Sequence, residues 1–187
     1  MAKTKKRVAG RPRRKAAGGS RQDAIAILKA DHRQVEQWFA QFEKTRSGPR
    51  KDALARQICH ALQVHTQIEE EIFYPAFLEA TQEKDIHHEA EVEHSGAKKL
   101  IAEIESSEPA DDYFDAKVTV LSEMIKHHVR EEEKSGGMFA KARQAEMDLK
   151  QLGERLAARK MELESGNGKA SGTRLVNLGE RHSEAIR

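Results

Sequence analysis

The sequence has little cysteine, proline or aromatic content, and it lacks any long apolar run. Cys59 is the single cysteine among 187 residues, so no internal disulfide can form and a reducing, cytoplasmic environment is expected. Four prolines and 5% aromatics argue against a β-sandwich. No apolar stretch approaches the roughly 20 residues of a membrane span, and the chain stays polar until Ile25, which argues against a signal peptide. No membrane association is expected.

Charge is plentiful but unevenly placed. Residues 1–21 contain nine Lys or Arg and no acidic residue, so the rest of the chain holds 24 basic and 31 acidic side chains, a net charge of −7 (24 − 31). Residues 1–20 can bury too little apolar surface to offset ordering entropy, which predicts a disordered basic arm. The arm either binds nucleic acid, because Lys and Arg displace counterions from phosphates, or only solubilises the chain. Residues 9–13 (AGRPR) faintly resemble a minor-groove-binding AT-hook.

The next part of the chain, to about residue 140, has the periodicity of four amphipathic helices. Apolar residues and histidines recur at steps of three and four, which places them on one face of each helix. The four stripes are Ile25, Leu28, His32, Val35, Phe39 and Phe42; Leu54, Ile58, Ala61 or Leu62, His65, Glu69 and Ile72; Ala90, His94, Ala97, Ile101 and Ile104; and Phe114, Val118, Leu121, Ile125, His128 and Glu132. Pro49 suits the first turn of the second helix, and Pro75 should disturb its continuation.

Short connections between these helices predict an all-α, antiparallel up-down four-helix bundle over residues 21–140. Ser135, Gly136 and Gly137 end the fourth helix. A thin apolar stripe over 138–163 predicts one further, strongly charged helix, which we assign to 141–165 outside the bundle. The Gly-rich segment from Gly166 begins a predicted flexible tail over 166–187.

Six polar residues lie on the apolar stripes, and they carry the chemistry. Each helix has one histidine, and the second and fourth helices add a glutamate one turn later: His32, His65, Glu69, His94, His128 and Glu132. Residues four apart share a helix face, so each HxxxE pair directs an imidazole and a carboxylate into the same interior. A single histidine on such a face is usually a satisfied core residue. Two buried carboxylates facing four imidazoles would be too costly without cations between them.

The same pattern occurs twice. The interval from His32 to His94 (94 − 32 = 62) nearly equals that from His65 to His128 (128 − 65 = 63) and that from Glu69 to Glu132 (132 − 69 = 63). A repeated helix pair carrying H and then HxxxE predicts a two-ion site with approximate two-fold symmetry. Each ion would have two histidines, and a carboxylate from each half would bridge them. Such donors suit iron, manganese or zinc, and the absence of cysteine ligands argues against a structural zinc site.

His127 competes with His128 for the fourth position. The interval between His32 and His94, applied alone, favours His127 with Glu131, whereas the helical stripe favours His128 with Glu132, because the alternative stripe would bury Lys117. We choose His128. Glu36 and Glu70 are candidate acceptors for the N–H groups of ligand imidazoles, although a purely structural role is more common. Four aromatic residues are expected to wall the bundle, and the remaining histidines to be on the surface: Trp38, Phe39, Phe73 and Tyr74; His60, His87, His88 and His182.

Four segments over about residues 22–140 resemble the bacterial hemerythrin-like, or HHE cation-binding, domains. They are LKADH (28–32), HTQIEEEIFYP (65–75), EVEH (91–94) and HHVREEE (127–133). The resemblance implies two non-haem iron ions with an oxo or hydroxo bridge, with manganese or a mixed pair as alternatives. It implies terminal ligands His32, His65, His94 and His128 and bridging carboxylates Glu69 and Glu132.

Two residues depart from the oxygen-carrying members of that family. Those proteins have a His-x-x-x-His pair on the third helix, but the position four before His94 is Ala90. One iron then lacks a protein ligand, or Glu91 replaces it. Glu132 follows its histidine by four positions, where the carriers have an aspartate one position farther on. Reversible oxygen carriage therefore does not follow from the resemblance.

The resemblance implies three kinds of function. The first is a module that binds or senses O₂, NO or peroxide in oxidative or nitrosative stress, with the vacant position taking the ligand. The second is a di-iron redox enzyme, either peroxide-consuming or like the iron–sulfur repair factors, which usually carry an N-terminal cysteine-containing domain that this chain lacks. The third is an iron reservoir tethered to DNA by the basic arm. We favour a metal- and gas-binding protein over a dedicated enzyme; the sequence leaves the oligomeric state open.

Overall fold

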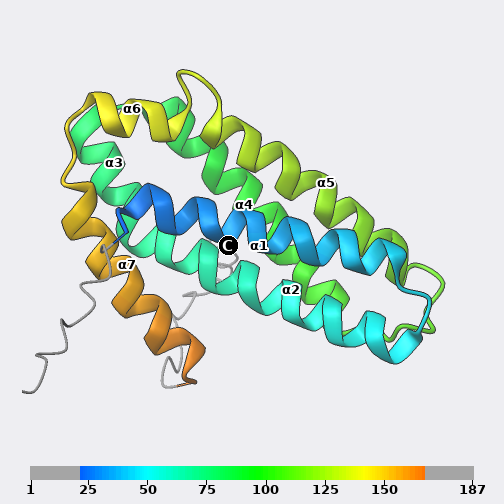
Figure 1. Cartoon of the computed structure of the whole chain (residues 1–187). Helices are drawn as coiled ribbons and strands as arrows, with labels where there is room; N and C mark the ends of the chain where they lie inside the picture. The colour runs from blue at the N-terminus through cyan, green and yellow to red at the C-terminus, as the bar shows by residue number, and fades with distance from the viewer. Residues whose placement is uncertain (1–21, 167–187) are drawn as a thin grey trace, which may run out of the picture.

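Four long helices form a bundle in the computed structural model, which describes residues 22–166 (Figure 1). They are α1 (Ala24–Lys44), α2 (Gly48–Ile68), α4 (Lys84–Glu105) and α5 (Phe114–Glu133). Each packs against two others, in the cyclic order α1, α2, α4, α5, and successive helices run in opposite directions (Figure 1). The predicted all-α up-down bundle is confirmed. The basic arm predicted for 1–20 and the tail predicted beyond residue 166 lie outside the described residues.

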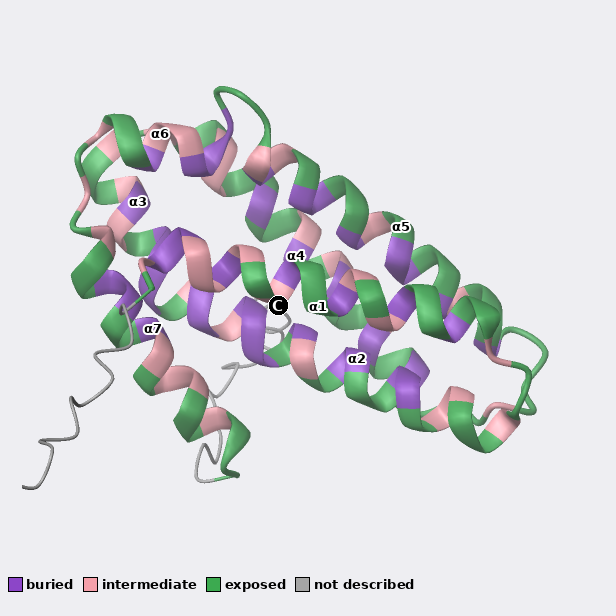
Figure 2. Ribbon diagram, in the orientation of Figure 1, coloured by how far each residue is buried: buried purple, intermediate pink, exposed green. Residues whose placement is uncertain are grey.

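The buried faces of the bundle helices are the stripes that the sequence predicts. In α4 the buried residues are Ala90, His94, Ala97, Ile101 and Ile104, and the buried faces of all four helices turn inward (Figure 2). Local signals determine where the helices begin. Asp23 accepts a hydrogen bond of 2.7 Å from the N–H of Ala26 and so caps α1, and Pro49 occupies the first turn of α2.

A polar layer divides the apolar core into two clusters. One cluster lies toward the α1–α2 and α4–α5 loops and includes Phe39, Phe42, Ile58, Ile101 and Phe114. The other lies at the opposite end of the bundle and includes Ile25, Leu28, Phe73, Phe77 and Phe139. On α1, α2 and α4 the stripe histidine falls between the two clusters, as His32 does between Leu28 and Val35, and on α5 His128 lies at the edge of the first cluster. The histidines therefore share one cross-section of the bundle.

The second helix does not stop at Pro75. A π-helical turn, η1 (Glu69–Phe73), joins α2 to α3 (Tyr74–Thr81). Within it the N–H of Tyr74 donates to the carbonyl of Glu69, five positions earlier. Pro75, which has no N–H to donate, lies in the first turn of α3. The disturbance expected at Pro75 is thus a widened turn, a feature that often marks functional sites.

The segment expected to be one helix over 138–163 contains two. They are α6 (Met138–Gln144) and α7 (Leu149–Glu164). Glu146 has a φ of 55°, a left-handed conformation that an α-helix cannot contain, and Asp148 caps α7 by accepting from the N–H of Gln151 at 2.9 Å. Helix α6 lies beside α3 and α5 at one end of the bundle, and α7 packs on α1 and α2 (Figure 1). Within residues 22–166, no helix combines the length and apolarity needed to cross a bilayer.

Candidate metal centre

The four stripe histidines meet in two pairs inside the bundle. The Nε2 atom of His32 lies 3.1 Å from that of His65, and the Nε2 atom of His94 lies 3.2 Å from that of His128. All four side chains are buried, with 1–4% of their residue surface exposed. Each pair joins two neighbouring helices, α1 with α2 and α4 with α5, and its ring nitrogens face each other. Each pair could hold one ion.

Both glutamates of the layer lie between the two histidine pairs. Glu69 Oε2 is 3.3 Å from Nε2 of His65 and 3.4 Å from Nε2 of His94. The carboxylate of Glu132 is 3.4 Å from Nε2 of His32 and 3.7 Å from Nε2 of His128. Each carboxylate therefore contacts one histidine of each pair, which is the arrangement that two bridging carboxylates require.

These six side chains are better suited to binding metal cations than to satisfying one another's hydrogen bonds. Glu69 Oε1 and Glu132 Oε2 are buried without a hydrogen-bond partner, which is costly in a dry interior. The four histidines line a small void of about 10 Å³, close to the space that one water-sized sphere needs. Imidazole and carboxylate donors suit iron, manganese or zinc. Divalent cations would satisfy the unpaired oxygens and neutralise the two carboxylates.

The glutamate directly after each candidate bridging glutamate contacts the Nδ1 atom of a histidine. Nδ1 of His32 lies 2.8 Å from Glu133, and Nδ1 of His94 lies 3.0 Å from Glu70. An N–H donated outward from Nδ1 leaves Nε2 free to face the centre. The prediction of Glu70 as such an acceptor agrees with this contact. Glu36 instead accepts from Arg33 at 2.8 Å, which is the purely structural role that is more common for such a residue.

The acidic residue directly before His32 and the one directly before His94 each lie close to the histidine of the neighbouring helix. Nδ1 of His128 lies 2.7 Å from Glu93, and Nδ1 of His65 lies 3.5 Å from Asp31. The repeat of the ligands extends to these supporting groups, because Asp31 and Glu93 are separated by the interval that separates His32 from His94 (93 − 31 = 62). Three of the four histidines are thus held by a hydrogen bond to a carboxylate, and His65 lies within ion-pair distance of the fourth.

The structure brings His128, rather than His127, to the polar layer. The His127 side chain is 53% exposed, and its Nε2 lies 3.2 Å from the Oε1 of Glu93. Glu131, the partner in the competing assignment, forms an ion pair with Lys134 at the surface. The helical stripe was therefore a better guide here than the repeat spacing.

Tyr74 belongs to the site, although sequence reasoning placed it only in the wall of the bundle. Its hydroxyl lies 3.2 Å from Glu132 Oε1, 3.4 Å from Glu69 Oε2 and 3.2 Å from Nε2 of His94. In a regular α-helix Glu69 and Tyr74 would point about 140° apart, and the wider π turn brings the two side chains closer to the same face. Burial and the charges of Glu69 and Glu132 raise the pKa of Tyr74 well above its usual value. It is a neutral hydrogen-bond donor.

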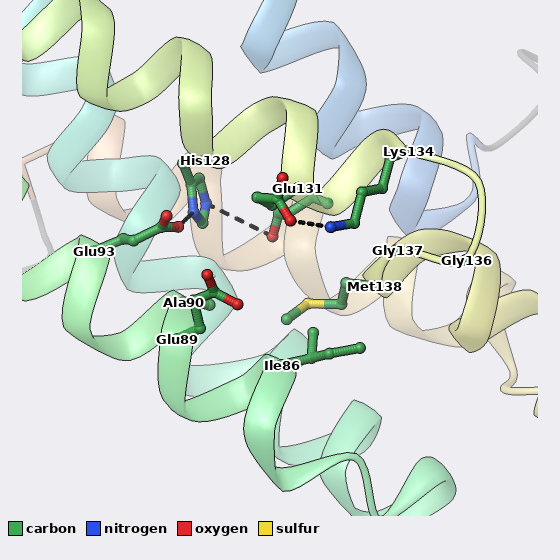
Figure 3. A pocket seen from close by; sticks show the side chains of 11 residues that line it. Ile86, Glu89, Ala90, Glu93, His128, Glu131, Lys134, Gly136, Gly137 and Met138 are labelled. Atoms are coloured by element: carbon green, nitrogen blue, oxygen red, sulfur yellow. Dashed lines mark hydrogen bonds and ion pairs between the residues drawn. The ribbon is translucent and has the colours of Figure 1, made fainter.

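Ala90 borders a cavity of about 210 Å³ that leads from the surface to the polar layer (Figure 3). His128 and Glu132 line its inner end, with Met138 beside them. In the first half of the chain the equivalent position (90 − 62 = 28) is Leu28, which is fully buried. A small side chain at Ala90 leaves open the space that the equivalent leucine fills.

Glu91 does not take the place of the histidine that is absent at Ala90. Its side chain points outward, 53% exposed, and lies 3.5 Å from Nδ1 of His87. His87 is less exposed than expected, because its ring packs edge-on against Tyr74 at 5.9 Å. His60 and His88 are exposed as predicted, and His182 lies outside the described residues.

Comparisons with known proteins agree with this fold and site. The profile of the hemerythrin HHE cation binding domain family matches residues 23–142, most of the chain, so the chain belongs to that family. A crystal structure of a hemerythrin HHE cation binding domain-containing protein from Mycobacterium kansasii superimposes with a TM-score of 0.65 at 21% identity, covering 78% of this chain and 89% of that one. At this identity the likeness supports the fold alone.

A curated relative is much longer than this chain. A DNA nickase from Nostoc sp. (strain PCC 7120 / SAG 25.82 / UTEX 2576) is 28% identical over 117 residues, which is 63% of this chain. The match spans 32% of the relative's own length. What the relative does as a whole protein is therefore no guide to this chain by itself.

Two groups in the layer hold protons that a cation would displace. Burial disfavours a charged imidazole, but Glu69 and Asp31 outweigh it and raise the pKa of His65 to about 10. Burial and the charge of Glu69 raise the pKa of Glu132 to about 8. Since both values lie above the ordinary 6.5 and 4.5, these two groups bind more protons in the folded metal-free chain than in the unfolded chain. Their contribution to the free energy of unfolding therefore falls as the pH rises, through about 8 for Glu132 and about 10 for His65. His32 acts in the opposite direction at lower pH, because burial and the charge of His65 lower its pKa to about 4.

Metal loading at pH 7 is therefore expected to release about two protons per chain, because ligands bind cations in their deprotonated forms. The apparent metal affinity should rise with pH over the same range, and the melting temperature of metal-free protein should fall. Titrating Fe²⁺ anaerobically into weakly buffered protein with a pH indicator measures the release. Tight uptake without proton release would contradict this account of the layer.

Proposed function

We propose that the chain binds two iron ions in the polar layer and binds or senses O₂, NO or peroxide at the end of the cavity beside Ala90. The supporting observation is that two carboxylates lie between the two histidine pairs, and that the cavity reaches the His94–His128 pair. His32 and His65 would hold one ion and His94 and His128 the other, with Glu69 and Glu132 shared. Bound iron would supply redox chemistry and an open coordination position for a small ligand.

The chain's own residues would prepare the ligand position. His128 and Glu132 line the inner end of the cavity, so a ligand would approach the ion held by His94 and His128. Tyr74 can donate a hydrogen bond into the layer, and the two apolar clusters exclude bulk water from either side. The volume of about 210 Å³ is below the roughly 300–1,000 Å³ of sites for organic ligands. Its size favours a diatomic molecule or peroxide.

Visible spectroscopy of the reduced, iron-loaded chain tests this function. Addition of O₂ or NO should produce a new charge-transfer band that saturates at one ligand per centre. A stable band supports binding or sensing. Rapid conversion to the oxidised spectrum without such a band would favour the alternative of a redox enzyme, and a spectrum unaffected by O₂, NO and peroxide would contradict the proposal.

DNA tethering is a second candidate, favoured by the charge of residues 1–21. These residues carry nine basic side chains and no acid, and the curated relative is named a DNA nickase. We expect removal of residues 1–21 to abolish binding to duplex DNA, because the remaining chain has a net charge of −7 (24 − 31). If all nine cations contact phosphates, log K should fall against log salt with a slope of about −8.

Full-length His65→Ala protein is the control for tethering, since it changes the polar layer and leaves the basic segment intact. It should bind DNA like the parent chain. Equal DNA binding by the truncated and full-length chains, or binding that salt does not weaken, would contradict the tether.

A further inference from the structure

The outer end of the cavity carries its own cluster of metal-binding side chains. Glu89 and Glu93 lie one turn apart on α4, and His127 faces them from α5; one donor atom from each lies within 4.8 Å of the others. Glu89 and His127 are exposed, and Glu89, Glu93 and Glu131 line the cavity (Figure 3). Carboxylate and imidazole donors at this spacing suit a divalent transition-metal ion.

This cluster connects directly to the buried layer. Glu93 contacts His127 through Oε1 at 3.2 Å and His128 through Oε2 at 2.7 Å. At the inner end of the same cavity lies Glu132, whose side chain is 3% exposed and whose Oε2 has no hydrogen-bond partner. The cavity would therefore connect an ion at the outer cluster to a buried carboxylate oxygen of Glu132 that has no hydrogen-bond partner.

The other half of the pseudo-symmetric bundle lacks this cluster at the equivalent described positions. The counterparts of Glu89, His127 and Glu131 (89 − 62, 127 − 63 and 131 − 63) are the apolar residues Ile27, Val64 and Ile68. Helix α7 packs over that side, on α1 and α2. Its Lys160 pairs with Asp31, the equivalent of Glu93. The cavities on that side, of about 980 and 270 Å³, border Asp31 but none of the six candidate ligands. The cavity beside Ala90, by contrast, is lined by His128 and Glu132 and is acidic at its outer end.

Charge at the open face favours cations. Glu89, Glu93 and Glu131 surround the cavity with a single lysine among its lining residues, Lys134, which pairs with Glu131. The net charge of these four groups is −2, and like charges around a cleft with low-dielectric walls concentrate counterions and raise their association rate.

We propose that Glu89, Glu93 and His127 form a surface site for a divalent transition-metal ion, from which the ion passes beside Ala90 to the buried layer. The inference rests on the proposed function, because it needs the layer to bind metal. Glu93 also positions His128, so the residues that test the route without disturbing the layer are Glu89 and His127.

The rate of metal loading tests the route. Full-length metal-free protein is mixed anaerobically with Fe²⁺, or with Co²⁺ as a visible probe, in a stopped-flow instrument. The double variant Glu89→Gln/His127→Gln is compared with His88→Gln/Glu91→Gln, which removes the same two residue types from a second exposed cluster that does not line the cavity. We expect the first variant to load about tenfold more slowly. Its final metal content and loaded spectrum should match those of the parent, and the control should load at the parent's rate.

Two results would overturn the route while leaving the proposed function intact. One is a Glu89→Gln/His127→Gln protein that loads as fast as the parent, and the other is an equal slowing of both double variants. Failure of the parent chain to bind metal in the layer, shown by uptake that His65→Ala does not change, would overturn both proposals.

Discussion

Replacing His65 by alanine is expected to reduce the bound metal from two ions to less than one per chain. His65 lies 3.1 Å from His32 and 3.3 Å from Glu69, so its loss leaves one ion with a single imidazole. Because Glu69 and Glu132 each contact both histidine pairs, the second ion should weaken as well. At a free metal concentration of 1,000 times the dissociation constant, binding stabilises a folded chain by about 4 kcal/mol. The variant should lose most of that stabilisation.

Elemental analysis and thermal unfolding with and without metal measure this effect. His60→Ala is the matched control, because His60 is an exposed histidine on the same helix, and it should keep both ions. Comparing the metal-free parent with metal-free His65→Ala separates a folding defect from lost binding. Two tightly bound ions in His65→Ala protein would contradict the assignment of the layer.

Replacing Ala90 by leucine is expected to weaken the binding of a small ligand such as azide or NO by about tenfold or more, with no loss of metal. The larger side chain would fill the cavity next to His128 and Glu132, as Leu28 does at the equivalent position of the first half. Leucine offers no donor to a metal ion, so the change blocks access without adding a ligand. A loss of about 1.4 kcal/mol in binding free energy corresponds to the tenfold effect.

Optical titration of the iron-loaded chain with azide, and of the reduced chain with NO, measures the change. Ala90→Ser is the control, because it keeps the small volume, and it should bind both ligands like the parent chain. Unchanged ligand affinity in Ala90→Leu protein that holds two irons would show that ligands reach the centre by another path.

The bundle and its polar layer could be predicted because they depend on periodicity. Stripes at steps of three and four determine which side of a helix is buried, and a duplicated H and HxxxE pattern places six side chains in one cross-section. The supporting carboxylates could not be predicted as fully. Asp31, Glu93 and Glu133 lie in charged runs that resemble ordinary solvated faces, and only the packed helices show which of them reach an Nδ1 atom.

The features that the sequence did not predict depend on local geometry or on volume. Tyr74 reaches the layer because a π turn shifts it relative to Glu69; Pro75 predicted a disturbance of the helix there, but not that it would take the form of a π turn. The break between α6 and α7 depends on the left-handed conformation of Glu146, a residue that most often continues a helix. The cavity beside Ala90 depends on how the neighbouring helices pack around a small side chain, which the pattern of apolar residues does not predict.

The pseudo-two-fold repeat explains why the two halves of the layer are alike, and the residues outside the repeat explain why they differ. The ligands and their supporting carboxylates recur at nearly constant intervals along the sequence, so each ion would have an equivalent set of donors. The residues around those donors do not recur. Leu28 and α7 cover one side, whereas the cavity beside Ala90 reaches His128 and Glu132 on the other, so the proposed ligand and metal routes both use the His94–His128 side.

Iron content combined with Mössbauer spectroscopy, on the full-length chain purified without chelators, tests the central claim most directly. Two irons per chain that form one magnetically coupled pair in the oxidised state are the predicted result. A chain that holds no iron, or holds it as a single magnetically isolated ion, would contradict the account.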